Sequence, residues 1–238
     1  MRHQVAVTLD RPPNLVQTLA HARMGNGDPC VRVVDGAVWR ATRTPSGVAT
    51  QRLSLAADGS VLVDAWGPGA EWLIERAPAL CGAHDAPGGF QPDQPLLRHL
   101  VHFNPGLRIG RTEAVFETAL FVAMEQRVAT RDAWRSWRGF VRALGEPAPG
   151  PLAGLWAPPS AERIAHTPYE VFHRFGLDRR RADVLRRLAV VAHRLDETVS
   201  LPQATRRCGR WIWSYARCVT VRLAQPCFKV FTLSTRLA

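Results

Sequence analysis

The chain has 238 residues, of which 46% are hydrophobic and 21% charged, and a formal net charge of +11. These values are typical of a globular protein with one large domain or two small ones. It has no run near 18 apolar residues, no apolar leader and an odd number of cysteines. The sequence therefore predicts no membrane span, no secretory signal, no disulfide framework and a cytoplasmic location.

The first part of the chain is predicted to be β-rich, because short runs of Val, Leu and Trp alternate with turn signals. Asp35-Gly36 and Asp58-Gly59-Ser60 are such signals, and Asp-Gly pairs favour tight antiparallel hairpins. We expect an antiparallel sheet between about Val5 and Trp66. Its predicted strands are Val31–Val34, Val38–Arg43, Gln51–Leu55 and Val61–Trp66.

Helical periodicity dominates after the sheet. A short helix is expected over Ala70–Ala77, ended by Pro78, and Thr112 and Thr130 are predicted to cap the two long helices that follow. The other predicted helices are Leu96–Phe103, Ser160 to about His166, Thr167–Phe175 closed by Gly176, and Asp178–Val199.

These elements predict an α+β fold, with a small N-terminal antiparallel β lobe followed by a mostly helical body. The expected divisions are a β-rich lobe with one helix over residues 1–80 and a Gly- and Pro-rich linker over 81–95. A helical body is expected over 96–205, and an atypical basic tail over 206–238.

The positive charge is concentrated at the C-terminal end. The last acidic residue is Glu197, and the 41 residues after it hold six Arg, one Lys and no acidic side chain. Such a tail attracts polyanions. Use of 30 Arg against one Lys also fits codon bias in a GC-rich genome, but that bias does not explain the missing acids.

The chemistry-bearing residues do not form a metal or phosphate-loop motif. His99 and His102 share a helix face, but no cysteine or carboxylate stands at a recognised spacing from them. Gly25-Asn26-Gly27 is not followed by a helix that starts with Lys-Ser or Lys-Thr, so a plain loop is expected. We therefore predict no metal and no cofactor.

Two basic segments are candidate DNA contacts. Gln126 and Arg127 lie at a predicted helix end, where an amide and a guanidinium can touch phosphates or base edges. Arg179, Arg180 and Arg181 start a helix, against its dipole, which is sensible if a phosphate backbone lies opposite. In both cases an ordinary solvated surface is the alternative.

In their order along the chain, five stretches resemble the helix-hairpin-helix superfamily of DNA base-excision glycosylases. The resemblance is to its 3-methyladenine glycosylase II branch, in the actinobacterial form, and covers about residues 20 to 205. The stretches are Ala22–Asp28, Val63–Gly69, Leu107–Thr112, Val122–Val128 and Phe175–Ala182. The resemblance implies excision of alkylated purines by base flipping.

The sequence departs from the family pattern after Leu201-Pro202. The family has a glycine-rich hairpin there, whose backbone approaches DNA phosphates, and this chain offers Gly209, Trp213 and Ser214 in an altered spacing. The family also places an Asp downstream, at the mouth of the base pocket, and no acidic residue follows Glu197. We therefore expect no catalytic residue of that kind, and a C-terminus altered by frameshift or truncation.

The resemblance implies a monomeric partner of double-stranded DNA, homologous to 3-methyladenine DNA glycosylases and impaired or inactive in catalysis. Two alternatives stay open at this point. One is a DNA-binding module without catalysis. The other is a pseudogene product whose C-terminal body is incompletely packed.

Overall fold

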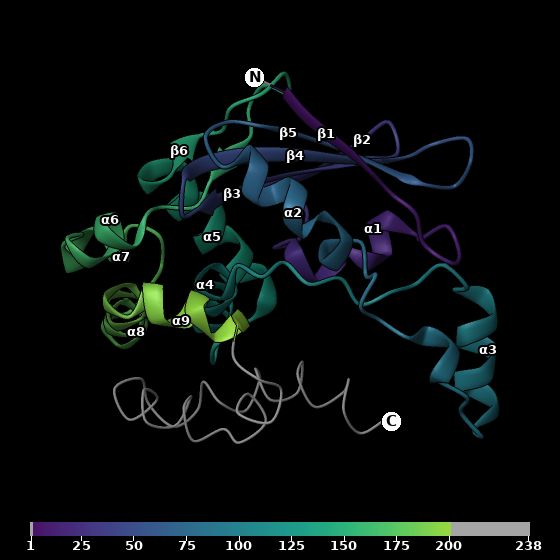
Figure 1. Cartoon of the computed structure of the whole chain (residues 1–238). Coiled ribbons are helices and arrows are strands. Elements are labelled where there is room, and N and C mark those ends of the chain that lie inside the picture. The colour runs from purple at the N-terminus through teal and green to yellow at the C-terminus, as the bar shows by residue number, and fades with distance from the viewer. Residues whose placement is uncertain (1, 201–238) are drawn as a thin grey trace.

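The computed structural model describes residues 2–200, which form a five-stranded sheet with helices beneath it (Figure 1). The sheet is antiparallel throughout, in the order β1-β5-β4-β3-β2. Its strands are β1 (Arg2–Val7), β2 (Val31–Val34), β3 (Ala37–Thr44), β4 (Gly47–Leu55) and β5 (Val61–Trp66). The expected α+β class is confirmed, since the remaining elements are mostly helical.

Tight turns account for the strand boundaries. Asp35 and Gly36 both have positive φ, +50° and +74°, which is the backbone of a two-residue hairpin between β2 and β3. The predicted bounds of β2 and β5 are confirmed. Strand β4 begins at Gly47 rather than Gln51, because Pro45 and Ser46 alone make the turn after β3 and pairing starts directly at Thr44 and Gly47.

The helical elements follow in chain order. Between β1 and β2 come α1 (Leu15–Thr18) and η1 (Ala20–Ala22), and after β5 come α2 (Ala70–Leu80) and η2 (Pro87–Gly89). The next three are α3 (Pro95–Phe103), α4 (Val115–Glu125) and α5 (Thr130–Leu144). A small ladder of β6 (Glu146–Pro147) and β7 (Trp156–Ala157) precedes α6 (Ala161–Ala165), α7 (Tyr169–His173), α8 (Arg179–Val190), α9 (Ala192–Glu197) and η3 (Thr198–Ser200).

Three predicted helix boundaries are wrong. Pro78 does not end α2, which continues to Leu80 because Ala79 and Leu80 are buried against the core. Thr112 does not cap α4, since Glu113 has a φ of +53° and the helix starts only at Val115. Thr130 is the first residue of α5, and its N-cap is Ala129.

The last predicted helices are shorter than expected. Helix α7 covers Tyr169–His173 rather than Thr167–Phe175. The helix expected over Asp178–Val199 is divided at Val191, whose φ of −105° and ψ of 12° are not helical. Ser160 caps α6 as predicted, accepting the backbone N–H of Arg163 at 3.1 Å, and Gly176 closes the α7 turn with a φ of +72°.

One hydrophobic core joins the sheet to the helices. The inner face of the sheet contributes residues such as Val38, Leu53 and Val63, and α4, α5 and α8 contribute further residues to the same cluster. Trp137 of α5 lies at its centre with no exposed surface, its ring edge-on to Phe121 at 4.4 Å. The α4–α5 pair is therefore anchored to the sheet as well as to the later helices.

Helix α3 differs from the other helices. None of its residues is buried, and it stands apart from the body (Figure 1). Its apolar side chains are open to solvent, with Leu96 63% and Phe103 65% exposed.

Candidate nucleic-acid interface

The junction between α4 and α5 carries two structural irregularities. Gln126, at the C-terminal end of α4, has a buried Nε2 that finds no hydrogen-bond partner among residues 2–200. Arg127 follows with a φ of +60°, a left-handed conformation that is uncommon for residues other than glycine. Unpaired buried amides and strained backbone both occur preferentially at functional sites. The predicted pair Gln126 and Arg127 therefore stands on a junction with these features.

The surface around this junction is basic. Arg127, Arg131 and Arg135 are exposed, and the first-turn carboxylate Asp132 pairs with Arg135 at 3.4 Å. Desolvation raises the pKa of the Glu125 carboxyl, and a hydrogen bond from Trp134 opposes that rise. The basic side chains therefore outnumber the acidic ones at this end of α5.

Asp178, the N-cap of α8, partly neutralises the positive charge of the three arginines at the start of this helix. Asp178 accepts the backbone N–H of Arg181 at 2.9 Å and its guanidinium Nε at 3.1 Å. Desolvation favours a higher pKa for Asp178, but the hydrogen bonds and charge of Arg181 outweigh it and lower the pKa. Arg181 also donates to the Gly176 carbonyl at 2.8 Å, so it clamps the start of the helix.

The other two arginines of the run have different surroundings. The Arg179 guanidinium lies 5.3 Å from the centre of the Tyr169 ring, where Arg186 also packs at 4.7 Å. Arg180 is exposed. Cation–π packing fixes Arg179 while leaving its charge available at the surface.

The turn that precedes α8 lies against the middle of α5. A Cβ placed on Gly176 would be 3.6 Å from the Ser136 hydroxyl, and one on Gly139 would be 3.0 Å from the Phe175 ring. Ser136 is about 9 Å along the helix axis from Thr130, at 1.5 Å per residue. The turn before Arg179–Arg181 therefore touches the middle of α5, whereas Gln126–Arg127 precedes the first residue of that helix.

The sequence pattern missed the role of the loop Arg23–Asp28. The expected loop is confirmed, but Asp28 is also a buried anchor that accepts the backbone N–H groups of Met24 at 2.7 Å and Cys30 at 2.8 Å. It also accepts the indole N–H of Trp137 at 3.0 Å, which ties the loop to α5. Burial raises the pKa of Asp28, against the effect of these hydrogen bonds. In the sequence, an Asp between a Gly and a Pro indicates only a turn, so the buried role of Asp28 could not be predicted.

A second buried polar contact also escaped the sequence pattern. Arg40 of β3 donates to Glu117 of α4 at 3.1 Å, and Thr42 donates to the same carboxylate. All three side chains are buried, and the Arg40 Nε and the Gln51 Oε1 have no partner among the described residues. This cluster fixes α4 on the sheet, and no periodicity can reveal a pair 77 residues apart.

Within residues 2–200 no three His, Cys, Asp or Glu side chains are grouped as metal ligands. His99 and His102 instead pack on the Phe103 ring, with ring centres 4.4 and 5.3 Å apart. In the same part of the chain, no helix has the length and apolar character needed to cross a membrane. Gly209, Trp213 and Ser214 lie outside the described residues.

The fold is shared with solved DNA glycosylases. One structure it matches is a 3-methyladenine DNA glycosylase from Archaeoglobus fulgidus, with a TM-score of 0.65 and 18% identity over 79% of this chain and 66% of that one. Another is MBOgg1, solved in complex with a low-affinity DNA ligand, with a TM-score of 0.61 and 14% identity over 84% of this chain and 65% of that one. No protein-family model and no curated protein sequence matches the chain.

The chain thus spans just under two thirds of the length of each of these two proteins. At this level of identity the comparison establishes a common fold. It agrees with the glycosylase-type architecture that the sequence resemblance implied.

Proposed function

We propose that the chain is a DNA-binding protein of the helix-hairpin-helix glycosylase superfamily, from the actinobacterial 3-methyladenine glycosylase II branch. It acts as a cytoplasmic monomer on double-stranded DNA. Its excision of alkylated purines is impaired. The glycosylase fold and the order of the five resembling stretches support this assignment.

The α4–α5 junction carries the proposal. There, a buried unpaired amide of Gln126 and a left-handed Arg127 sit on a basic surface within the glycosylase fold. The exposed guanidinium of Arg127 suits a phosphate, and the Gln126 amide, whose Nε2 is buried and unpaired, gains a partner when its side chain turns outward to a base edge or phosphate. We assign Arg180, which is exposed at the start of α8, to the same DNA-binding surface.

The proposed impairment of catalysis rests on the distribution of carboxylates. The family pattern uses an Asp after its hairpin to stabilise charge that develops on the sugar, whereas none of the 41 residues from 198 to 238 is acidic. On the candidate surface, Asp132 and Asp178 are paired with Arg135 and Arg181. They support the fold of the surface rather than the chemistry.

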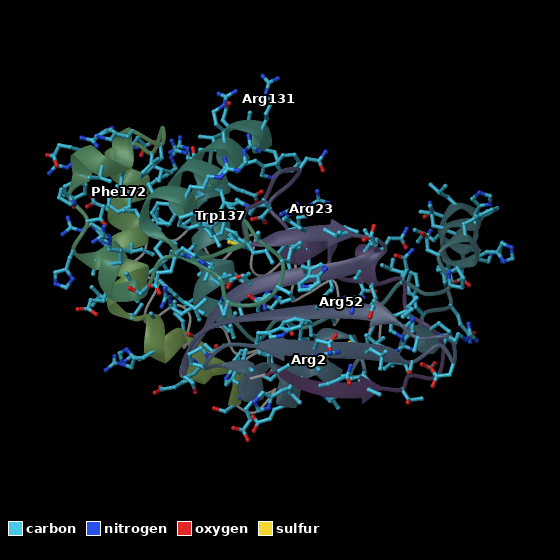
Figure 2. All side chains as sticks on the ribbon, turned by 90° about the horizontal axis from the view of Figure 1, so that it is seen from above. Arg2, Arg23, Arg52, Arg131, Trp137 and Phe172 are labelled. Carbon is cyan, nitrogen blue, oxygen red and sulfur yellow. The ribbon has the colours of Figure 1, made fainter. Side chains whose placement is uncertain are left out.

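Binding of the full chain to a fluorescein-labelled DNA duplex tests the DNA contact. We expect affinity to fall steeply between about 50 and 200 mM salt, and Arg127→Gln to weaken binding and reduce the salt slope by about 0.9. Arg52→Gln is the matched control, because it removes the same charge from the sheet, away from Arg131 (Figure 2). Equal affinities of Arg127→Gln and the native chain would contradict the proposed contact.

Catalysis is tested separately, with duplex DNA that carries 7-methylguanine or 3-methyladenine. We expect little or no free base above the rate without protein. Rapid release of either base would refute the impairment and leave the DNA-binding assignment standing.

A further inference from the structure

A groove of about 290 Å³ lies at the free edge of the sheet, on the side of β2. Apolar residues, Leu19 of the segment after α1 and Val31 and Val33 of β2, form part of its lining. Val33 is 40% exposed, so solvent reaches the groove. Trp134 of α5 and Arg23 of the neighbouring loop also line it.

The loop that borders the groove is held rigidly against Trp134. Gly25 has a φ of +68°, and a Cβ at this position would come within 2.2 Å of the indole ring, so only glycine lets the backbone lie on it. Asp28 fixes the other end of the loop through its three buried hydrogen bonds. The groove is therefore formed before any ligand arrives, which lowers the entropy cost of binding.

Two guanidinium groups converge on one residue of this loop. Arg23 donates to the Asn26 side-chain oxygen at 2.9 Å and to the Gly25 carbonyl at 3.0 Å, and Arg138 donates to the Asn26 carbonyl at 3.0 Å. Both groups are positioned by neutral acceptors and keep their full charge. Within residues 2–200 no carboxylate forms an ion pair with Arg23, Arg131 or Arg138.

The nearby acids do not cancel this charge. Asp28 is buried beneath the loop and Asp132 is paired with Arg135, which leaves Glu125, a hydrogen-bond acceptor of Trp134, as one carboxylate against the three guanidinium groups of Arg23, Arg131 and Arg138. Arg131 lies one turn of α5 from Trp134, and Figure 2 shows it on the same side of the molecule as Arg23. The groove thus combines an aromatic wall with a rim of positive charge.

We propose that this groove is a second nucleic-acid contact, which takes one unstacked base of a single strand beside Trp134 while Arg23, Arg131 and Arg138 bind the adjoining phosphates. Aromatic platforms flanked by arginines are the usual means of holding single strands. The slot has the size of a single small ligand and cannot admit a duplex. This contact goes beyond the proposed duplex binding and does not depend on Arg127.

The test uses the full chain and a single-stranded oligothymidine of about twelve nucleotides, a length within the range that one binding domain covers. We expect Trp134→Ala to weaken binding by about 5- to 100-fold, and Trp134→Phe, which keeps a ring, to recover most of the loss. Arg23→Gln should weaken binding and reduce the salt slope by about 0.7. Circular dichroism and melting curves establish that each variant is folded.

Crosslinking of the native chain to 5-iodouridine oligonucleotides gives a readout that needs no variant, and adducts should map to the peptide containing Trp134. Adducts elsewhere, or unchanged oligothymidine affinity in folded Trp134→Ala, would overturn the proposal. So would a polyglutamate peptide that binds as tightly as the oligonucleotide and is equally sensitive to Trp134→Ala, since it would identify an acidic peptide as the ligand.

The Arg127→Gln variant separates the two proposals. If it loses duplex binding but keeps single-strand binding, both contacts are supported. If it leaves duplex binding intact while Trp134→Ala abolishes single-strand binding, the duplex proposal fails and the groove stands.

Discussion

Helices α3 and α5 are both amphipathic, but only α5 buries its apolar face in the core. Helix α5 buries Trp137, Phe140 and Val141 completely, because the sheet, α4 and the segment around Phe172 converge on its apolar face. Helix α3 buries no residue, and Leu96 and Phe103 stay open to solvent. Periodicity therefore determines that a helix forms, while the surfaces supplied by the rest of the chain determine what its apolar face contributes to stability.

Truncation at the centre of the α5 face should have the largest effect. Trp137→Ala removes a fully buried ring and leaves Asp28 without its indole donor, so we expect a loss of about 3–5 kcal/mol in the free energy of unfolding. Urea denaturation measures the change. Trp137→Phe keeps most of the volume and should lose less. A loss below about 1 kcal/mol for Trp137→Ala would show that α5 does not anchor the core.

The anchor beneath the loop should have a smaller, pH-dependent effect. Asp28→Asn places an amide N–H against a backbone donor, and we expect it to cost about 1–3 kcal/mol at neutral pH. Because burial raises the pKa of Asp28, the folded protein holds that proton to higher pH than the unfolded chain. Native stability should therefore fall as pH rises from the ordinary Asp pKa through the folded one, and then level off.

Denaturation curves across this pH window check the linkage. The Asp28→Asn variant should lack this component of the slope, while Asp58→Asn, at an exposed turn, should retain it. If the pH dependence of stability is unchanged in Asp28→Asn, titratable groups other than Asp28 are its cause.

Next in size is the contact between the loop and α5. Gly25→Ala introduces a methyl group into the Trp134 ring at a positive φ, and we expect it to cost more than the about 1–2 kcal/mol of left-handed strain alone. Gly36→Ala is the matched control, since its φ is +74° but nothing lies within 4 Å of the added Cβ. Thermal melting of both variants separates backbone strain from the clash. Equal losses would mean that Trp134 moves aside freely.

The smallest effect is expected on α3. Leu100→Ser changes a side chain that is 48% exposed, so stability should change by no more than about 0.5 kcal/mol. Urea denaturation measures this change, and the stability loss is compared with that of Leu120→Ser, at a fully buried position of α4. A large loss for Leu100→Ser would show that α3 is packed in solution.

The sequence alone predicted the elements whose cause is local. Strands β2 and β5 follow from short apolar runs between Gly-containing turns, Ser160 caps the start of α6, and Gly176 closes the turn after α7. The failures came where distant residues decide. Helix α2 passes Pro78 because residues beyond it are buried, and α4 starts late because Glu113 leaves the helical region.

The candidate site divides in the same way. Gln126, Arg127 and the arginines at the start of α8 could be selected from residue type and position. The convergence of Arg23 and Arg138 on Asn26 could not, because it joins residues 112 apart through backbone carbonyls. The buried role of Asp28 depends on Trp137, which is 109 residues away.

The ion pair between Arg40 and Glu117 has a consequence for how the molecule can be divided. One partner belongs to the sheet and the other to α4, and both are hidden from water. A protease nick near Gly88, in the exposed stretch that separates them, would leave each fragment with a lone charge to solvate. Neither fragment would then stay folded by itself, and mixing the two should restore the native fold as a noncovalent complex of both fragments.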